Sequence, residues 1–281
     1  MKKLENRVAL ITGAGRGIGR AIALAYAREG AKLSLAARTQ SELEQTTRDA
    51  QSLGASTCIQ TADVTAQAQV DVLVRHTVEQ FGTIDILVNN AGIAGPIGPL
   101  HQNDVNACIQ AIQVNLIGTY LCCRSVLPVM LEQNRGKIIN LSGAGATSAW
   151  PDLSAYGVSK VAVVRLTETL ALELEGTNIQ VNALGPGSIH TQMWDELRDG
   201  AKAAGATQIY ELGQQVTSGG GASMADAASL AVWLASDDAG GLNGRLMSSS
   251  RDGWSDLAAR IPEIMASDVF TLRRVELSSG T

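Results

Sequence analysis

The sequence is poor in the residues that metal sites, disulfide frameworks and nucleic-acid surfaces require. Its four cysteines show no CxxC spacing and its three histidines have no partners at ligand spacing, which predicts free thiols and no metal site. Lysine and arginine are scattered, and the formal net charge is -5. No basic run therefore predicts a nucleic-acid partner or binding to an anionic membrane surface.

The sequence also lacks segments that would take the chain out of the cytoplasm. Met1-Lys2-Lys3 leads into a charged turn, without the apolar run and small-residue cleavage site of a secretory signal. No segment is expected to be long and apolar enough to cross a bilayer. The adjacent Cys122 and Cys123 lie in an apolar helical stretch and are interpreted as small core residues. We therefore expect a globular cytoplasmic protein.

What the sequence does contain is a regular alternation of strand-like and helix-like segments. Because a parallel strand pair needs a crossover connection, this alternation predicts an α/β fold: a Rossmann-type doubly wound parallel sheet flanked by helices. The expected strands are 7–12, 32–37, 57–60, 84–89, 137–142, 179–184 and 245–248. The expected helices are 18–29, 41–52, 67–81, 108–131, 155–175 and 224–236.

One domain is expected over residues 1–250, followed by a C-terminal tail over 251–281. The alternation breaks at 190–223, where polar and small residues, among them Gly219-Gly220-Gly221, interrupt an amphipathic stretch. This segment is predicted to be a mobile lid over a substrate site.

A glycine-rich turn follows the first expected strand and opens the first expected helix. It reads Thr12-Gly13-Ala14-Gly15-Arg16-Gly17-Ile18-Gly19. Without Cβ atoms at Gly13, Gly17 and Gly19 the backbone can approach a pyrophosphate, and the helix beginning near Ile18 supplies free N–H groups and partial positive charge. In this βαβ context the turn predicts a dinucleotide site.

The end of the second expected strand favours NADP(H) over NAD(H). The position where an acidic residue would bind the adenosine ribose holds Ala37, and Arg38 follows it. Arg38 and Arg16 could pair a 2′-phosphate through charge-assisted hydrogen bonds. Asp63-Val64, after the third strand, has two open interpretations: contact with the adenine, or a helix N-cap at Asp63.

Tyr156 and Lys160 are four residues apart on an expected helix, so both side chains leave the same face. An ammonium beside a phenol favours phenolate and is expected to lower the tyrosine pKa toward working pH. The pair predicts a general acid/base that protonates a carbonyl oxygen during reduction.

As a set, the motifs resemble a classical short-chain dehydrogenase/reductase over about residues 7–246. They are the Thr12–Gly19 turn, Asn89-Asn90-Ala91-Gly92, Asn115, Tyr156-Gly157-Val158-Ser159-Lys160, and Pro186-Gly187 with Thr191. The resemblance implies an NADP(H)-dependent oxidoreductase that interconverts a ketone and a secondary alcohol.

The resemblance also implies roles for the matched positions. Asn90 would lie against the adenosine side of the cofactor, and Lys160 would hold the nicotinamide ribose. Pro186, Gly187, main-chain groups near Ile189 and the Thr191 hydroxyl would form the nicotinamide site, with Ile189 and Thr191 gripping its carboxamide. Asn115 would hold a water in a proton relay; satisfying helix backbone at a kink is its alternative role.

One position departs from the family pattern. The family places a serine about thirteen residues before the tyrosine, and that count falls on Gly143. We expect the adjacent Ser142 to supply the hydroxyl to the reacting oxygen, with Thr147 or Ser148 as alternatives. Loss of such a donor typically costs a few kcal/mol in barrier.

The substrate site is expected in loops at the carboxyl ends of the strands, which carry Trp150, Met193 and Trp194. These apolar residues predict a small carbonyl or alcohol substrate with an apolar body. The resemblance implies a homodimer or homotetramer through the helices 108–131 and 155–175. The long tail departs from the family and could cap the active site or a neighbouring subunit.

Two other functions share part of this motif set. An epimerase or dehydratase of the extended branch would keep Tyr-x-x-x-Lys, but would space its glycines differently and carry a larger C-terminal domain. A non-catalytic NADP(H)-binding sensor would fit Gly143 and the tail, although the intact Tyr156 and Lys160 pair argues against it.

Overall fold

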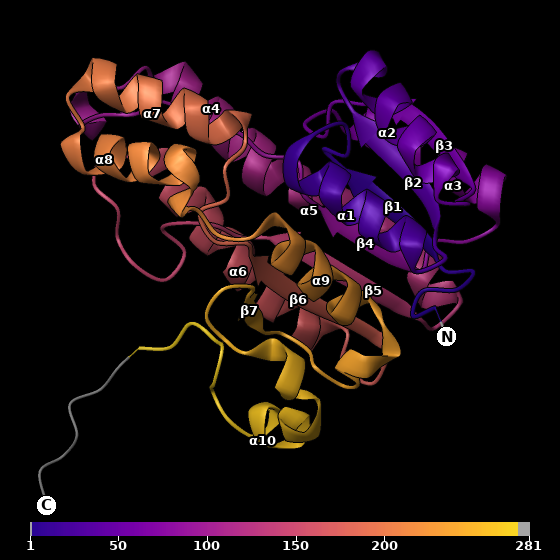
Figure 1. The fold of residues 1–281 in the computed structure, drawn as a ribbon. Coiled ribbons are helices and arrows are strands. Elements are labelled where there is room, and N and C mark those ends of the chain that lie inside the picture. Colours follow the sequence, from indigo (N-terminus) through magenta and orange to yellow (C-terminus); the bar gives the residue numbers. More distant parts are fainter. Residues whose placement is uncertain (1, 275–281) are drawn as a thin grey trace, which may run out of the picture.

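The computed structural model describes residues 2–274, and its centre is a seven-stranded sheet in which every pairing is parallel (Figure 1). The strands are β1 (Val8–Thr12), β2 (Lys32–Ala37), β3 (Thr57–Thr61), β4 (Ile86–Asn89), β5 (Gly136–Leu141), β6 (Ile179–Gly185) and β7 (Leu246–Ser248). Their order is β3-β2-β1-β4-β5-β6-β7. The expected doubly wound fold is confirmed.

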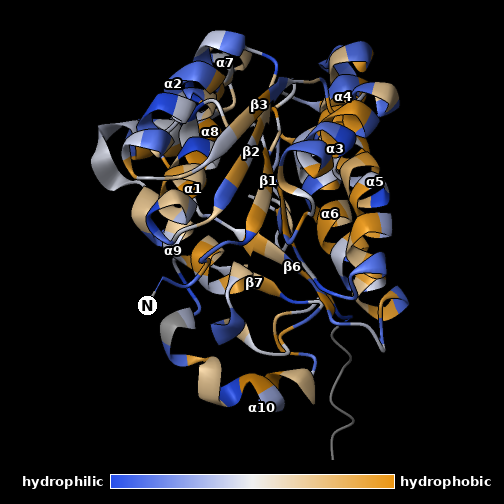
Figure 2. Ribbon diagram, turned by 90° about the vertical axis from the view of Figure 1, so that its right-hand side faces the viewer, coloured by the Kyte–Doolittle hydropathy of each residue, from blue (hydrophilic) through white to orange (hydrophobic). Residues whose placement is uncertain are grey.

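Helices cover both faces of the sheet (Figure 2). One face carries α1 (Gly17–Arg28), α2 (Gln40–Ser52) and α9 (Met224–Ala235), which share one apolar core with the strands. The other face carries α3 (Gln67–Phe81), α5 (Gly118–Glu132) and α6 (Ser154–Glu173) around a second core. Strands buried on both faces, such as β1, are continuously apolar for this reason.

The strand order reverses between β1 and β4, and this reversal positions the site. The chain leaves β1 toward β2 on one side, and β4 begins the other half of the sheet. In open α/β sheets a ligand crevice forms at the carboxyl ends of the strands at such a point. The turn after β1 and the Asn90-Ala91-Gly92 segment after β4 meet there.

The segment 190–223, expected to be an irregular mobile lid, is mostly helical. It forms α7 (Gln192–Ala204), α8 (Thr207–Gln215) and a π-helical turn at Val216–Gly220. The two helices pack on each other and bury Trp194, Leu197 and Ile209 in an apolar cluster that also includes Ala94 and Leu153. The polar residues that interrupt the amphipathic pattern of this segment in the sequence lie on the outer faces of two short amphipathic helices.

The long helix expected at 108–131 is interrupted. It consists of α4 (Val105–Ile112), a π-helical turn at Gln113–Ile117, and α5. Together they form a 28-residue apolar helix, Val105–Glu132, that is long enough to cross a membrane by length and composition. The expectation that no such segment exists was therefore wrong. Here the helix packs on the sheet, with Cys122 and Cys123 buried as free thiols, as expected.

The described part of the tail is folded against the domain. It contains short 3-10 turns at Trp254–Asp256 and Ala258–Arg260, and the helix α10 (Ile261–Met265). Leu257, Ile261 and Ile264 are buried in the same core as α1 and α9. This stretch lies below the β7 side of the sheet (Figure 1) and does not line the cavity described next.

Candidate active site

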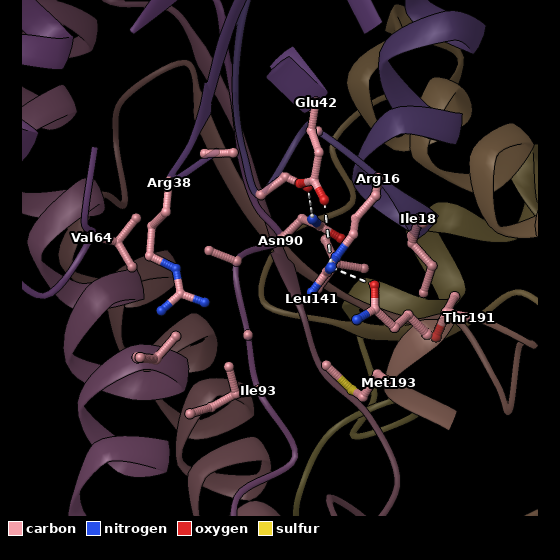
Figure 3. Close-up of a pocket in the computed structure, with 18 of the residues that line it drawn as sticks. Arg16, Ile18, Arg38, Glu42, Val64, Asn90, Ile93, Leu141, Thr191 and Met193 are labelled. Atoms are coloured by element: carbon pink, nitrogen blue, oxygen red, sulfur yellow. Dashed lines mark hydrogen bonds and ion pairs between the residues drawn. The ribbon is translucent and has the colours of Figure 1, made fainter. Parts of the chain in front are cut away.

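A cavity of about 440 Å³ lies at the carboxyl ends of the strands and is lined by most of the residues singled out from the sequence (Figure 3). The predicted residues on its wall are Gly13, Arg16, Gly17, Ile18, Arg38, Asp63, Val64, Asn90, Ser142, Tyr156, Lys160, Pro186 and Thr191. The predicted residues Gly19, Asn115, Gly187 and Ile189 are not among the residues that line it. The geometry thus gathers residues from seven separate segments around one space.

The glycine turn is held in shape by Asn90. The Asn90 side-chain amide donates to the carbonyls of Thr12 and Gly13, both at 3.0 Å, and the Thr12 hydroxyl accepts from the Asn90 N–H at 3.1 Å. A Cβ on Gly13 would lie 2.8 Å from that amide nitrogen, and a Cβ on Gly19 would overlap the Gly13 carbonyl. These two glycines are required by close backbone approach.

The amino end of α1 faces the cavity without a side-chain cap. Its N-cap is Arg16, which makes no capping hydrogen bond, and Gly17 adopts a left-handed φ of +55°. The first N–H groups of a helix have no partner within the helix and attract anions. Ile18 and Thr191 line the space in front of them. This end of the cavity can hold a phosphate.

The two arginines stand in different surroundings (Figure 3). Arg16 lies 3.5 Å from the Glu42 carboxylate and donates a short hydrogen bond to the Gln192 side chain at the start of α7. Arg38 also lines the cavity, close enough to Asp63 to lower the pKa of that carboxyl. An anion bound in this part of the cavity would contact the Arg38 guanidinium directly. Arg16 would first have to give up its contacts with Glu42 and Gln192.

Glu42 and Gln192 were missed from the sequence. Both line the cavity, and Glu42 places a carboxylate beside the Arg16 guanidinium. Glu42 lies in the first turn of α2, shortly after the end of β2, and this position beside the expected cofactor site was the available signal. Gln192 could not be found this way, because the helix α7 was not expected.

Asp63 and Val64 both lie on the cavity wall. The Asp63 carboxylate accepts from the Thr65 N–H at 2.9 Å and from the Thr65 hydroxyl at 2.8 Å, and the backbone bond is the main reason that the pKa of Asp63 is lowered. The N-cap of α3 is Ala66. The helix N-cap interpretation of Asp63 is therefore wrong, since its side chain closes a turn before the helix begins.

Tyr156 and Lys160 emerge from the same face of α6, as expected. The Lys160 ammonium nitrogen lies 5.8 Å from the Tyr156 ring centroid and donates to the Leu141 carbonyl at 2.9 Å. Burial raises the pKa of Tyr156 to about 12 and lowers the pKa of Lys160 to about 8. The expected lowering of the tyrosine pKa is wrong for this geometry, because desolvation disfavours the phenolate more than the lysine favours it.

Asn115 lies in the π-helical turn between α4 and α5. Its side chain accepts from the Ile93 N–H at 2.8 Å and donates to the Ile93 carbonyl at 3.0 Å and to the Ser159 hydroxyl at 2.9 Å. Ser159 in turn donates to the Tyr156 carbonyl at 2.7 Å. Single π turns inside helices often occur at functional sites. This one connects the loop after β4 to the turn of α6 that carries Tyr156.

The loop after β5 places Gly143, the position that breaks the family pattern, against the Tyr156 hydroxyl. A Cβ on Gly143 would overlap the Tyr156 oxygen. Ser142 lines the cavity, but its hydroxyl lies 3.5 Å from the Lys160 carbonyl, a long hydrogen bond. Thr147 and Ser148 are exposed and do not line the cavity. Of the three hydroxyls considered, Ser142 alone faces this space.

The opposite wall combines the loop after β6 with the α7–α8 segment. Pro186, His190, Thr191 and Met193 line the cavity, and Gly187 has a left-handed φ of +78°. Trp150, Met193, Trp194 and Tyr156 belong to one apolar cluster with α7 and α8. Within residues 2–274, no three histidine, cysteine or carboxylate side chains gather where they could hold a metal ion.

Comparison with known sequences gives one family and a large set of relatives. A family model described as short chain dehydrogenase matches residues 7–202. The chain is 38% identical to 2-(R)-hydroxypropyl-CoM dehydrogenase of Xanthobacter autotrophicus over 248 residues, which cover 85% of this chain and 95% of that protein. It is 35% identical to the 3-oxoacyl-acyl-carrier-protein reductase FabG of Thermotoga maritima over 209 residues, covering 74% and 84%.

Solved structures agree over nearly the whole chain. Levodione reductase superposes with a TM-score of 0.82 at 33% identity, covering 91% of this chain and 99% of that chain. NAD+-bound xylitol dehydrogenase gives 0.79 at 28% identity and coverages of 88% and 98%. A variant of actinorhodin polyketide ketoreductase with NADPH gives 0.80 at 28% identity and coverages of 88% and 97%. Similar chains thus carry either nicotinamide cofactor.

Proposed function

The chain belongs to the classical short-chain dehydrogenase/reductase family, and we propose that it is an NADP(H)-dependent oxidoreductase that interconverts a ketone and a secondary alcohol. The observation that carries the proposal is that Tyr156 and Lys160 line the same cavity as the glycine turn. A nicotinamide dinucleotide fits these residues: the Gly13 turn has no room for side chains, and the amino end of α1 is uncapped toward the cavity.

In this proposal the proton passes through Tyr156. When bound, the nicotinamide cofactor supplies the hydride to a carbonyl carbon or accepts it from an alcohol. Tyr156 donates its hydroxyl proton to the carbonyl oxygen in reduction; in oxidation the phenolate that remains after loss of this proton takes the proton of the alcohol. Because burial raises the pKa of Tyr156 to about 12, the phenol holds its proton at neutral pH and serves as the acid.

Lys160 and Asn115 support this proton transfer. With a pKa of about 8, Lys160 is mostly charged at pH 7 and would exchange the Leu141 carbonyl for the hydroxyls of the cofactor ribose. Asn115 would hold a water that connects Lys160 to solvent, since both side chains lie within 4 Å of the Cβ position at Gly92. Ser142 would donate its hydroxyl to the reacting oxygen.

The choice of NADP(H) over NAD(H) rests on the end of β2. Ala37 leaves no carboxylate at the strand end, and Arg38 faces the cavity. The Glu42 carboxylate would repel a 2′-phosphate unless the Arg16 guanidinium neutralises the carboxylate. The 3.5 Å contact between the Glu42 and Arg16 side chains supports this neutralisation. Arg38 is therefore proposed as the main ligand of the 2′-phosphate, and Arg16 as a second ligand. Asp63, Val64 and Asn90 are proposed to line the adenosine side of the site.

The substrate is proposed to be a small carbonyl compound with an apolar body. Its site would lie between Tyr156 and the cluster that contains Trp150, Met193 and Trp194. The nicotinamide end would rest on Pro186 and Gly187, with Ile189 main-chain groups and the Thr191 hydroxyl at the carboxamide. The enzyme is proposed to act in the cytoplasm.

A second copy of the chain is the proposed macromolecular partner. Five exposed apolar side chains lie on α5, α6 and the π turn before α5, and we call this set the α5/α6 face: Ile117, Tyr120, Leu131, Val158 and Leu172. Only 39% of an apolar 18-residue window of the Val105–Glu132 helix is buried. The hydropathy colours of Figure 2 show apolar residues along α5 and α6. Apolar surface of this kind marks an interface, and a homodimer that pairs these helices would cover it.

The test is a panel of ketones and secondary alcohols, followed by nicotinamide absorbance with NADPH and with NADH. We expect turnover of at least one apolar ketone with NADPH, abolished in Tyr156→Phe. Cofactor binding without turnover of any compound, unchanged by that substitution, would contradict the proposed activity and favour a sensor. Tighter binding of NADH than of NADPH would contradict the cofactor assignment alone.

A further inference from the structure

The strand β7 is the last strand of the sheet, and its outer edge is covered by the chain's own tail. Successive residues of a parallel strand point their N–H groups to alternate sides. Two residues that flank β7 point their backbone groups toward β6. The Arg245 carbonyl accepts from the Ala183 N–H, and the Ser249 N–H donates to the Gly185 carbonyl. The outward N–H groups of β7 are therefore those of Leu246 and Ser248.

Both outward donors are satisfied by the segment that follows the strand. The Leu246 N–H donates to the Phe270 carbonyl at 2.8 Å, and the Ser248 N–H donates to the Asp252 carboxylate at 2.6 Å. Phe270 has a φ of +62°, a left-handed conformation that is rare for an aromatic residue. Such strain persists only where surrounding contacts enforce it, so the placement of this carbonyl is fixed by the packing of the tail.

Buried charged groups hold the tail in this position. The Arg245 side chain is 8% exposed, and its guanidinium donates to the carbonyls of Ile264 and Ser267 at 3.1 and 3.0 Å. The Glu168 carboxylate on α6 accepts from the Leu272 N–H at 2.7 Å. Trp254 packs on Trp233 of α9 with ring centroids 6.0 Å apart. The tail is thus anchored to β7, α6 and α9 at once.

An open edge strand is a template for pairing with another chain, and proteins close such edges with covering segments. We infer that residues 251–274 are an intramolecular cover that closes the β7 edge to a second copy, so that self-association stops at the dimer formed by the α5/α6 face. The limit to a dimer rests on the α5/α6 dimer of the proposed function; the closed edge rests on the contacts of the tail alone.

Two charged substitutions separate the two surfaces. Leu172 is 73% exposed on the α5/α6 face and Val269 is 49% exposed on the tail, so Leu172→Glu and Val269→Glu both place a charge at the surface without a cavity. By sedimentation we expect the unmodified chain and Val269→Glu at twice the 29.4 kDa chain mass, and Leu172→Glu at the mass of one chain. A dimer that persists in Leu172→Glu, or a mass that falls in Val269→Glu, would overturn the inference.

Amide exchange tests the edge in the full chain. The Leu246 and Ser248 amides should exchange equally slowly in the unmodified chain and in monomeric Leu172→Glu, because their acceptors lie in the same chain. Exchange that accelerates about 100-fold on dissociation would mean that another subunit covers the edge, and the inference would fail. If the unmodified chain is a monomer, the α5/α6 dimer is refuted, and slow exchange of these amides still decides the closed edge.

Truncation after Ser250 provides the converse test. Removing residues 251–281 frees the two outward donors, and we expect assemblies larger than two chains. A truncated chain that binds cofactor normally yet keeps the mass of the full chain would contradict the inference. If the truncated chain fails to fold, because Leu257, Ile261 and Ile264 leave the core, the exchange measurement decides the question.

Discussion

At the glycine-turn end of the cavity a ligand would meet mainly backbone groups, whereas at the Tyr156 end it would meet single side chains. The turn is fixed by Asn90 amide bonds to two carbonyls, and its surface is the uncapped end of α1. At the other end, Tyr156, Lys160 and Asn115 come from α6 and from a π turn far away in the sequence. A backbone site tolerates many side-chain changes and fails on an added Cβ, while a side-chain site fails when one functional group is removed.

The largest expected effect is at the side-chain end. Tyr156→Phe removes the acid and should lower kcat by about 1000-fold, because positioned general acids contribute factors of this order. The dissociation constant for NADPH should change less than about twofold, since the glycine turn is untouched. Stopped-flow absorbance and cofactor fluorescence measure the two quantities. Tyr120→Phe, on the exposed face of α5, is the matched control; an equal loss there would break the comparison.

Ser142→Ala should lower kcat by about 100-fold if its hydroxyl supports the reacting oxygen, a typical cost of losing one such donor. Its matched control is Ser148→Ala, because Ser148 is exposed and does not line the cavity. Steady-state kinetics with the best ketone would decide between them. A larger loss in Ser148→Ala or Thr147→Ala would show that the loop after β5 moves when substrate binds and that Ser142 is not the donor.

The backbone end should respond to an added methyl group. A Cβ on Gly19 overlaps the Gly13 carbonyl and the Asn90 amide, and overpacking of this kind costs about 1–3 kcal/mol. Gly19→Ala should therefore weaken binding of NADPH and NADH alike by roughly tenfold or more, measured by calorimetry. Gly241→Ala is the matched control, because it adds the same methyl group at a position where nothing lies within 4 Å of the new Cβ. Preference for one cofactor in Gly19→Ala would mean that the turn discriminates between them.

Arg38→Ala removes the main charged side chain proposed for the backbone end. Loss of a charge-assisted contact costs about 1.5–3 kcal/mol, so the dissociation constant for NADPH should rise about tenfold or more while that for NADH stays constant. Arg16→Ala should have a smaller effect, because Glu42 and Gln192 already engage Arg16. Arg28→Ala, at the far end of α1, serves as the control. Equal losses for both cofactors would refute the role of Arg38.

The smallest expected effect is a pH dependence of cofactor binding. The pKa of Lys160 is lowered to about 8, so its ammonium is present below pH 8 and lost above it. If the ammonium holds the ribose, the dissociation constant for NADPH should rise roughly fourfold between pH 7 and pH 8.5. Titration by fluorescence would measure this rise. Lys160→Met should bind more weakly and without that dependence; a persisting pH dependence would assign it to another group.

Local patterns in the sequence predicted much of this architecture. The succession of strands and helices along the chain, the glycine turn, and the shared helix face of Tyr156 and Lys160 were predicted because each depends on residues close in sequence. The same reasoning missed the α7–α8 pair, the π turn at Asn115 and the apolar length of Val105–Glu132. It also gave the wrong direction for the pKa of Tyr156, since burial is a property of the packed site.

The sequence by itself determined the alternation of strands and helices that gives a parallel sheet, and the family of the chain, because hydrophobic period and glycine placement act over a few residues. Only the tertiary structure decided that Glu42 pairs with Arg16, that Gly143 faces the Tyr156 hydroxyl, and that the tail covers β7. These contacts join residues 13 to 26 positions apart along the chain, and contacts of that span are chosen by packing rather than by local preference.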